Sequence, residues 1–398
     1  MKYIIIVADG MSDYPLEELE GRTPLEKAKT PNMDYIAKKG LVGRANMVPR
    51  GMPPGSDVAN LSIFGYNPKK YYTGRGPIEA ANLGVKLSTG EIVFRCNLVT
   101  ISGEVMTDYS SGHISTKEAS MIIDVLNQRL SNKYIKFYCG TSYRHLLCLK
   151  PTAKNPKFTA HCTPPHDITG KEISRYLPDG PGDQFLIDLM EVSNNILMNH
   201  EVNQVRVDLK ENPANMIWLW GQGERPEMPS FYSRFKVNGS VISAVDLIKG
   251  MGRLMGLSVI DVPNITGYYD TDYAAKADYA LKSLEEKDFV LIHVESPDEA
   301  SHNGDLREKI AAIENIDKKI VGKCIDYMER RGNCRLLVLP DHPTPIKLKT
   351  HTRDAICYTM CGEGIEVDNS MSYSEYISKN SEHNFKDGYK LMEAFIEK

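Results

Sequence analysis

Three short apolar segments of this chain have the composition of buried β-strands. Each is a run of β-branched and aliphatic residues bounded by polar or turn-forming ones, and they lie at residues 3–8, 289–294 and 335–339. Strands that are apolar on both faces are typical of a parallel sheet covered by helices on both sides. The three segments therefore predict central strands of such a sheet.

The stretch between the second and third segments has the periodicity of a helix. Over residues 306–330, Ile310, Ile313, Ile316 and Ile320 recur at helical spacing with Lys and Glu between them, which predicts one amphipathic helix. A strand, a helix and a second strand in this order indicate a parallel sheet. Residues 244–254 and 257–262 predict a second helix and strand of the same kind.

The middle of the chain has a different pattern. From residue 71 to residue 235 there are many short segments interrupted by Gly and Pro, including the polar stretch 150–165 and the loop 221–229. A length of 398 residues also exceeds what one hydrophobic core usually organises. We therefore predict an α/β protein whose core is discontinuous, formed by residues 1–70 and 236–398, with residues 71–235 as a smaller inserted α/β domain.

Composition narrows the class of protein. Hydrophobic residues make up 41% and charged residues 25%, which is ordinary for a globular chain, and the net charge of −4 has no basic block that would favour nucleic acid. The apolar N-terminal run is too short for a signal peptide, and no stretch approaches membrane-spanning length, so we expect a cytoplasmic protein that binds neither nucleic acid nor membranes. The 8 cysteines show no C-x-x-C pair, which argues against a zinc ribbon or redox site.

Acidic and imidazole side chains follow each predicted central strand. They are Asp9 after the first, Asp298 and His302 after the second, and Asp341, His342 and, a little later, His351 after the third. Taken singly, each has an ordinary explanation, such as a helix cap, a solvated surface pair or a loop hydrogen bond. Because parallel strands end at the same edge of a sheet, we expect the six side chains to gather there.

Three carboxylates and three imidazoles are enough ligands for two divalent metal ions. Carboxylate oxygen mixed with imidazole nitrogen suits Mn²⁺, Zn²⁺, Co²⁺ or Mg²⁺ better than copper or Ca²⁺. Two such ions can hold the attacking and leaving oxygens of a phosphoryl group in transfer. Phosphoryl transfer is therefore the reaction class that this ligand set favours.

Ser56 is the candidate nucleophile. It ends a stiff Gly/Pro loop at residues 51–57 and precedes a short predicted helix at 58–65. Backbone N–H groups at a helix N-terminus stabilise an anion such as a phosphate ester, and a bound metal would make the hydroxyl nucleophilic near neutral pH. The alternative is that Ser56 serves only as the N-cap of this helix.

Several phrases of the sequence together resemble one enzyme family. They are Asp9-Gly10-Met11, Thr23-Pro24-Leu25, Thr30-Pro31-Asn32-Met33, Gly55-Ser56-Asp57, Phe64-Gly65-Tyr66, Tyr72-Thr73-Gly74-Arg75-Gly76-Pro77, Pro297-Asp298-Glu299-Ala300-Ser301-His302 and Asp341-His342. In these phrases the chain is similar to the alkaline phosphatase superfamily and, within it, to the archaeal-type cofactor-independent phosphoglycerate mutases. The resemblance implies an alkaline-phosphatase-like core with two divalent metals, Mn²⁺ being favoured. It assigns one metal to Asp298, His302 and His351 and the other to Asp9, Ser56, Asp341 and His342.

The resemblance also implies a reaction of glycolysis and gluconeogenesis. Ser56 would take the phosphoryl group from 3-phosphoglycerate, the bound glycerate would reorient, and the phosphoserine would return the group to the 2-hydroxyl without free 2,3-bisphosphoglycerate. The inserted domain would close over this small phosphorylated substrate and supply His113 as an acid–base partner. Further candidates for substrate contacts are Arg144, His166, Asp167, Lys171 and Lys249, although each of them is equally consistent with a solvated surface position.

Other functions stay open at this stage. A branch of the same family shares phrases like residues 164–167 and 218–223 and has been proposed to make phosphohomoserine, so a homoserine phosphotransferase is the first alternative. A metal-dependent phosphomonoesterase is the second, since a loosely closed domain would let water attack the phosphoserine. A silent metal- and phosphate-binding module is the third, but it would have no use for an activated Ser56.

Overall fold

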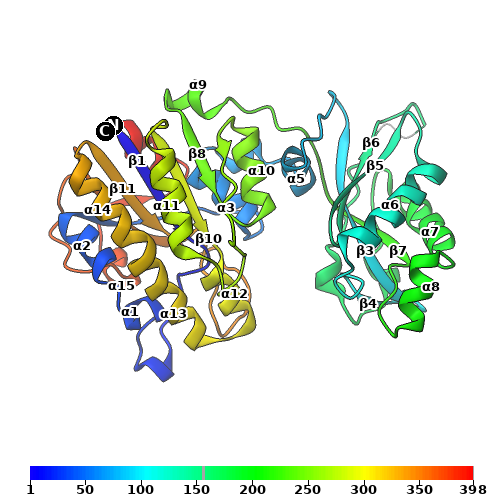
Figure 1. Cartoon of the computed structure of the whole chain (residues 1–398), viewed down its shortest axis with the longest axis horizontal. Helices are drawn as coiled ribbons and strands as arrows, with labels where there is room; N and C mark the ends of the chain where they lie inside the picture. Colours follow the sequence, from blue (N-terminus) through cyan, green and yellow to red (C-terminus); the bar gives the residue numbers. More distant parts are fainter. Residues whose placement is uncertain (155–156, 398) are drawn as a thin grey trace. The chain divides into compact units, whose positions relative to one another are not determined.

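The computed structural model describes residues 1–154 and 157–397, and the chain forms two compact units. Met1–Tyr72 and Met228–Lys398 make the first unit, and Thr73–Glu227 makes the second (Figure 1). The second unit ends at Glu227, earlier in the chain than the predicted end of the inserted domain at residue 235. The reason is that helix α9 (Phe231–Phe235) packs on the first unit, where the Phe231 ring lies 4.6 Å from that of Phe289.

The first unit is built on one eight-stranded sheet in the order β13-β2-β12-β11-β1-β10-β8-β9. The strands are β1 (Lys2–Ala8), β2 (Gly40–Ala45), β8 (Gly239–Ile242), β9 (Ser258–Val259), β10 (Phe289–Val294), β11 (Cys334–Leu339), β12 (Ile356–Gly362) and β13 (Asn384–Phe385). Within this sheet only β12 runs antiparallel to its neighbours. The three strands predicted at 3–8, 289–294 and 335–339 are confirmed as β1, β10 and β11, which lie next to one another at the centre of the sheet.

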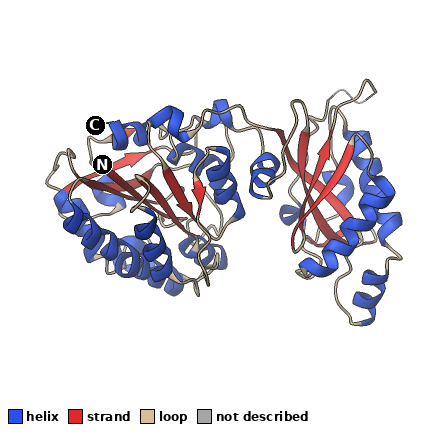
Figure 2. Ribbon diagram, turned by 45° about the horizontal axis from the view of Figure 1, so that its top comes forward, coloured by secondary structure: helices blue, strands red, loops and turns tan. Residues whose placement is uncertain are grey.

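Helices cover both faces of this sheet (Figure 2). Alternate residues of β1, such as Ile4 and Ile6, share a buried cluster with residues of α2 (Pro31–Lys39), α11 (Tyr273–Ser283), α13 (Leu306–Ile316) and α14 (Gly322–Arg331). On the opposite face Tyr3 packs edge-on against Phe395 of α16 (Lys390–Glu397). Helix α16 also contacts α3 (Ser56–Ile63) and α9. Helix α10 (Asp246–Leu254) packs against α3 and β8. The side chains of β1 are therefore buried on both sides, as a strand of uninterrupted apolar residues requires.

The helix predicted over 306–330 is present but is interrupted. A π-helical turn at Asp317–Val321 joins α13 to α14. The buried Asp317 carboxylate at the start of this turn accepts hydrogen bonds from the backbone N–H groups of Asn32 and Met33. These belong to the first turn of α2, where four N–H groups have no partner within the helix. The π-helical turn therefore lies at the point where the Asp317 side chain caps the N-terminus of α2.

The second unit has its own core around an antiparallel sheet in the order β4-β3-β6-β5, with β7 also pairing with β3. Its strands are β3 (Ile92–Ser102), β4 (Val105–Asp108), β5 (Ile135–Thr141), β6 (Arg144–Leu149) and β7 (Met216–Glu224). Helices α6 (Thr116–Leu130) and α7 (Asp183–Leu197) pack on this sheet, as does the shorter α5 (Arg75–Asn82). A mostly parallel sheet flanked by helices with a smaller inserted unit is the predicted fold class, which is confirmed. Among the described residues no helix has the length and apolarity needed to cross a membrane.

A buried ion pair joins α13 to the loop after β1. The Lys309 ammonium donates to Asp13 Oδ2 at 2.7 Å and to the Thr344 carbonyl at 3.0 Å, and both charged side chains are fully buried. We expect Lys309→Met to lower the free energy of unfolding by about 3–5 kcal/mol, because it leaves the Asp13 charge buried without its cation. Urea denaturation measures this loss. The double variant Asp13→Asn/Lys309→Met should recover part of it, and a single variant as stable as the wild type would contradict the expectation.

Glu375, at the start of α15 (Glu375–Lys379), predicts a pH dependence of stability. Its carboxylate accepts hydrogen bonds from Thr23 Oγ1 at 2.8 Å and from the Asp13 backbone N–H at 3.2 Å, and burial raises its pKa from 4.5 to about 7. Because the folded-state pKa exceeds the unfolded one, the stabilising contribution is complete below 4.5 and is lost as the pH rises through 7. Glu375→Gln should therefore stabilise the protein relative to wild type at about pH 8 but not at about pH 4. Urea midpoints at the two pH values test this, and an equal shift at both would contradict it.

Candidate metal centre

The site forms at the carboxyl ends of the three central strands. β1 pairs in parallel with both β10 and β11, so that Ala8 lies opposite Val294 and Val7 lies opposite Leu339. The residues that follow these strands therefore meet at one edge of the sheet. Gly10 has a positive φ of 63°, and its backbone N–H donates to Asp341 Oδ1 at 3.2 Å. The tight turn after β1 thus joins it directly to the loop after β11.

One cluster surrounds the carboxylate of Asp298. Asp298 and His302 lie one turn apart on α12 (Ser296–Asn303), and His302 Nε2 is 3.1 Å from Asp298 Oδ2. His351 Nε2 lies 3.6 Å from Asp298 Oδ1 and 3.0 Å from His302 Nε2. The three residues that the resemblance assigns to one metal are therefore together. His342 adjoins them, since one ligand atom each from Asp298, His342 and His351 lie within 4.8 Å of one another.

A second cluster surrounds the carboxylate of Asp9. Ligand atoms of Asp9, Asp341 and His293 lie within 4.8 Å of one another, and all three residues are buried. His342 also faces this cluster, with Nε2 at 3.6 Å from Asp9 Oδ1 and 3.4 Å from Asp341 Oδ2. His342 thus stands between the two clusters, and His293 is a residue that the sequence analysis did not select. It lies inside the apolar run of β10, where its one visible signal is a polar residue in an otherwise apolar strand.

Ser56 faces the same cluster. It is the first residue of α3, and its Oγ is 3.1 Å from His342 Nε2. Gly55 holds the N-cap position and makes no side-chain cap bond, so the alternative that Ser56 is only an N-cap is not what the structure contains. Asn60, one turn along the helix, donates to the Ser56 carbonyl at 3.0 Å and to Asp341 Oδ2 at 2.9 Å. The helix that carries Ser56 is therefore bonded directly to an acidic residue of the centre.

The electrostatics of the centre call for added positive charge. Burial, together with the neighbouring Asp341 and Asp298, raises the pKa of Asp9 well above its ordinary value. Burial alone would raise the pKa of Asp298 as well, but hydrogen bonds with His302 and His351 hold it well below its ordinary value. Asp9 Oδ1 and His293 Nε2 are buried and have no hydrogen-bond partner among the residues that the structure describes. Buried carboxylates with unpartnered oxygen and imidazole nitrogen atoms are the donor set that a divalent cation completes, so these residues fit such an ion.

The residues predicted in the insert form a group of their own in the second unit. The ring centroids of His113 and Tyr143 are 6.0 Å apart, those of Tyr143 and Tyr109 5.7 Å, and those of Tyr109 and His166 6.1 Å. Arg144 stacks over the Tyr143 ring at 4.8 Å, and Lys171 donates to the Asp167 carbonyl at 2.9 Å. His113, Arg144, His166, Asp167 and Lys171 are all exposed.

These side chains lie on an aromatic frame that was not predicted from the sequence. Trp220 continues the row of rings at 5.3 Å from His166, and Arg95 stacks over Trp220 at 4.4 Å. Arg95 is itself buried and lies 3.1 Å from Glu79. The surface of the second unit that carries the predicted substrate residues thus combines exposed imidazole and cationic groups with fixed aromatic rings. Their contacts with substrate stay a prediction.

Lys249, the one substrate candidate in the first unit, lies on α10. Its ammonium is 3.8 Å from Asp261 Oδ1, and the Asp261 side chain is 86% exposed. An ion pair with so exposed a partner holds the lysine only weakly. Its role toward a phosphoryl group therefore also stays a prediction.

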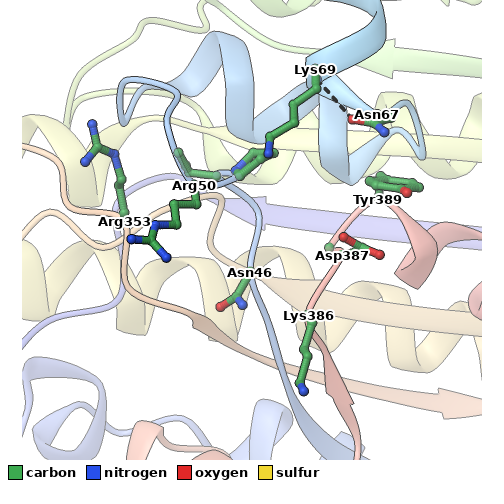
Figure 3. A pocket seen from close by; sticks show the side chains of 11 residues that line it. Asn46, Arg50, Asn67, Lys69, Arg353, Lys386, Asp387 and Tyr389 are labelled. Atoms are coloured by element: carbon green, nitrogen blue, oxygen red, sulfur yellow. Dashed lines mark hydrogen bonds between the residues drawn. The ribbon is translucent and has the colours of Figure 1, made fainter.

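A separate cavity of about 430 Å³ lies at the carboxyl ends of β2 and β13 (Figure 3). Four basic side chains and one acidic one contribute to its lining, namely Arg50, Lys69, Arg353, Lys386 and Asp387. Arg353 Nε donates to the Met52 carbonyl at 2.7 Å, which ties the wall of this cavity to the loop that leads to Ser56. None of the residues of the two clusters lines it.

Gly10 gives a test of how closely the turn after β1 packs against the centre. A Cβ added there would lie 2.4 Å from Asp298 Oδ1 and 2.7 Å from Thr344 Oγ1. We expect Gly10→Ala to displace Asp298 and to weaken Mn²⁺ or Co²⁺ binding by at least about 10-fold, the effect typical of disturbed ligand positioning.

Gly21→Ala is the matched control for this prediction. Gly21 also has a positive φ, of 80°, but an added Cβ would meet nothing within 4 Å. Both variants should share a backbone strain of about 1–2 kcal/mol, whereas only Gly10→Ala should lose metal affinity when titrated by calorimetry. Equal affinities in the two variants would show that Gly10 does not position the ligands.

Comparison with known proteins places the chain in a family. A family model described as 2,3-bisphosphoglycerate-independent phosphoglycerate mutase matches residues 37–203. The chain is 47% identical over 398 residues to 2,3-bisphosphoglycerate-independent phosphoglycerate mutase 2 of Methanothermobacter thermautotrophicus, covering 100% of this chain and 98% of that one. It is 46% identical to a probable enzyme of the same name from Geobacter sulfurreducens, with 100% of both chains covered.

Solved structures agree with this placement. A protein from Pyrococcus horikoshii is similar with a TM-score of 0.83 and 26% identity, covering 100% of this chain and 96% of that one. The cofactor-independent phosphoglycerate mutase of Thermoplasma acidophilum is similar with a TM-score of 0.67 and 25% identity, covering 100% and 99%. With relatives of this identity over its whole length, the chain belongs to the 2,3-bisphosphoglycerate-independent phosphoglycerate mutase family.

Proposed function

We propose that this protein interconverts 3-phosphoglycerate and 2-phosphoglycerate, with Ser56 carrying the phosphoryl group between the two hydroxyls. The observation that carries the proposal is the position of Ser56 Oγ, 3.1 Å from His342 Nε2 at the edge of the two clusters, in a chain of this family. In this scheme no 2,3-bisphosphoglycerate takes part. A divalent cation held there would lower the pKa of the serine hydroxyl and offset the charge of the phosphoryl oxygens. We favour Mn²⁺, and Mg²⁺, Co²⁺ and Zn²⁺ suit the same ligands.

The hydrogen bonds around His342 indicate which of its two ring nitrogens carries the proton. Thr344 Oγ1 donates its one hydrogen to Asp298 Oδ1 at 2.5 Å, so the same oxygen can only accept from His342 Nδ1, which lies 3.2 Å away. His342 therefore carries its proton on Nδ1 and turns an unprotonated Nε2 toward Ser56 Oγ. Burial lowers the pKa of His342, which favours this neutral form. The arrangement leaves Nε2 free to bind a metal or to accept the serine proton.

The position of Ser56 suits a phosphoserine intermediate. As the first residue of α3, it lies where the helix N-terminus offers unpaired backbone N–H groups and a positive dipole end to an anion. A phosphoserine must also be kept from water until the second hydroxyl attacks it. We assign the exclusion of water and the binding of glycerate to the second unit, where His113 would act as acid–base partner and Arg144 would bind an oxyanion.

Replacing the serine tests the proposal. Given Mn²⁺ and 3-phosphoglycerate, the wild type should form 2-phosphoglycerate, and Ser56→Ala should lose activity by about 10⁴- to 10⁶-fold, as losing a covalent nucleophile does. Its metal content should be nearly unchanged because the carboxylates and imidazoles remain. Ser62→Ala is the matched control on the same helix, since the Ser62 hydroxyl donates to the Met47 carbonyl at 2.6 Å and does not face the clusters.

Two other outcomes would change the assignment. If Ser56→Ala still consumes 3-phosphoglycerate at the wild-type rate and releases glycerate and inorganic phosphate, water rather than serine attacks, and the protein is a phosphomonoesterase. If homoserine with a phosphoryl donor gives phosphohomoserine while 3-phosphoglycerate gives no 2-phosphoglycerate, the substrate is wrong although the serine chemistry stands.

A further inference from the structure

His293 belongs to the Asp9 cluster by its position and has no part in the mechanism above. Its side chain is fully buried in β10, with Nε2 at 3.4 Å from Asp9 Oδ2. The other nitrogen, Nδ1, is 3.2 Å from Glu295 Oε1. Asp9 therefore presents one oxygen toward His293 and the other toward His342, at 3.6 Å.

The surroundings of Glu295 fix the proton of His293. Glu295 Oε2 accepts from the buried Lys276 ammonium at 2.7 Å, and Oε1 accepts from Ser243 Oγ at 2.7 Å and from the Ala244 N–H at 3.1 Å. Burial opposes ionisation of Glu295, but Lys276 and His293 overcome it and hold its pKa far below the ordinary value. A carboxylate has no hydrogen to give, so His293 must donate from Nδ1. When the ring carries a single proton, Nε2 is therefore the nitrogen that holds the lone pair.

An unprotonated Nε2 in this position lacks the hydrogen it would need to bond Asp9. It is buried, has no hydrogen-bond partner within the described ranges 1–154 and 157–397, and faces the carboxylates of Asp9 and Asp341. This nitrogen and the oxygens of the two carboxyl groups converge there, which is a donor arrangement that a divalent cation completes. A histidine whose second nitrogen donates to a carboxylate is also the usual form of a metal-binding imidazole.

We propose that His293 Nε2 is a ligand of a divalent cation shared with Asp9 and Asp341, and that the Lys276–Glu295 pair positions it by fixing its proton on Nδ1. This inference rests on the metal dependence in the proposed function but adds a ligand that the family resemblance does not include. An imidazole in the set favours Co²⁺, Zn²⁺ or Mn²⁺ over Mg²⁺ at this position. Glu295 and Lys276 act through His293, so they are positioning residues.

Binding of Co²⁺ to the metal-free protein tests the ligand. Titration followed by visible absorption should show that His293→Gln weakens one class of sites by at least about 10-fold and shifts its absorption band, since an amide replaces an imidazole. Glu295→Gln should weaken the same class and keep the imidazole in place. An unchanged affinity and spectrum in His293→Gln would overturn the proposal.

His145→Gln is the matched control. His145 is likewise a buried histidine whose Nε2 meets no hydrogen-bond partner among the described residues, and its Nδ1 accepts from the Gly140 N–H at 3.1 Å. It lies on β6 in the second unit and belongs to neither cluster. Its replacement should leave Co²⁺ binding as in the wild type, and a loss equal to that in His293→Gln would mean that the effect is general destabilisation.

A measurement without substitution covers the case in which a variant does not fold. In ¹⁵N-histidine-labelled metal-free protein, the resonances of His293 should show a proton on Nδ1 alone, and adding Zn²⁺ should shift Nε2. A doubly protonated ring near neutral pH that does not respond to Zn²⁺ would show an ion pair with Asp9 in place of a ligand. Failure here leaves the Ser56 results standing, whereas full turnover of Ser56→Ala would overturn the proposed function whatever His293 does.

Discussion

The parallel pairing of β1 with both β10 and β11 is the constraint on which the rest of this structure depends. It places three strand ends side by side and so brings together carboxylates from distant parts of the chain, Asp9, Asp298 and Asp341. The strands can lie at the centre of the sheet because their side chains are apolar on both faces and helices cover both. The same burial that stabilises the sheet removes water from the acids at its edge.

Buried acids need partners, and most of the polar contacts of the centre follow from that need. His302 and His351 hold Asp298 ionised, Asn60 and the Gly10 N–H bond to Asp341, and Thr344 links Asp298 to His342. In the part of the chain that the structure describes, Asp9 is the exception, because one of its oxygens has no hydrogen-bond partner there and its pKa is raised by burial and by its acidic neighbours. A divalent cation would satisfy this carboxylate, and it is the kind of ion that the proposed phosphoryl chemistry would use.

The two units have separate cores and carry different candidate residues. The first has a complete sheet and carries the serine and both clusters, while the second has an antiparallel sheet and its own apolar core beneath the exposed His113, Arg144 and His166. Because each unit has its own core, a substitution on the surface of the second need not disturb the packing around the clusters of the first.

The sequence by itself determined the central strands and the acidic and imidazole residues that follow them. The central strands at 3–8, 289–294 and 335–339 can be predicted because a strand buried on both faces leaves an unbroken apolar run in the sequence. Polar side chains just beyond such a run are then easy to recognise. Ser56 could be predicted as the candidate nucleophile for a similar reason, because its hydroxyl lies between a Gly/Pro loop and a short helix. Only the tertiary structure decided the rest. In it β12 runs antiparallel to β11, and Asp317 caps α2. Phe231 packs in the first unit, and His293, inside an apolar strand, lies beside Asp9. Each of these depends on a partner far away in the chain, and local pattern carries no information about which distant groups a buried polar atom will meet.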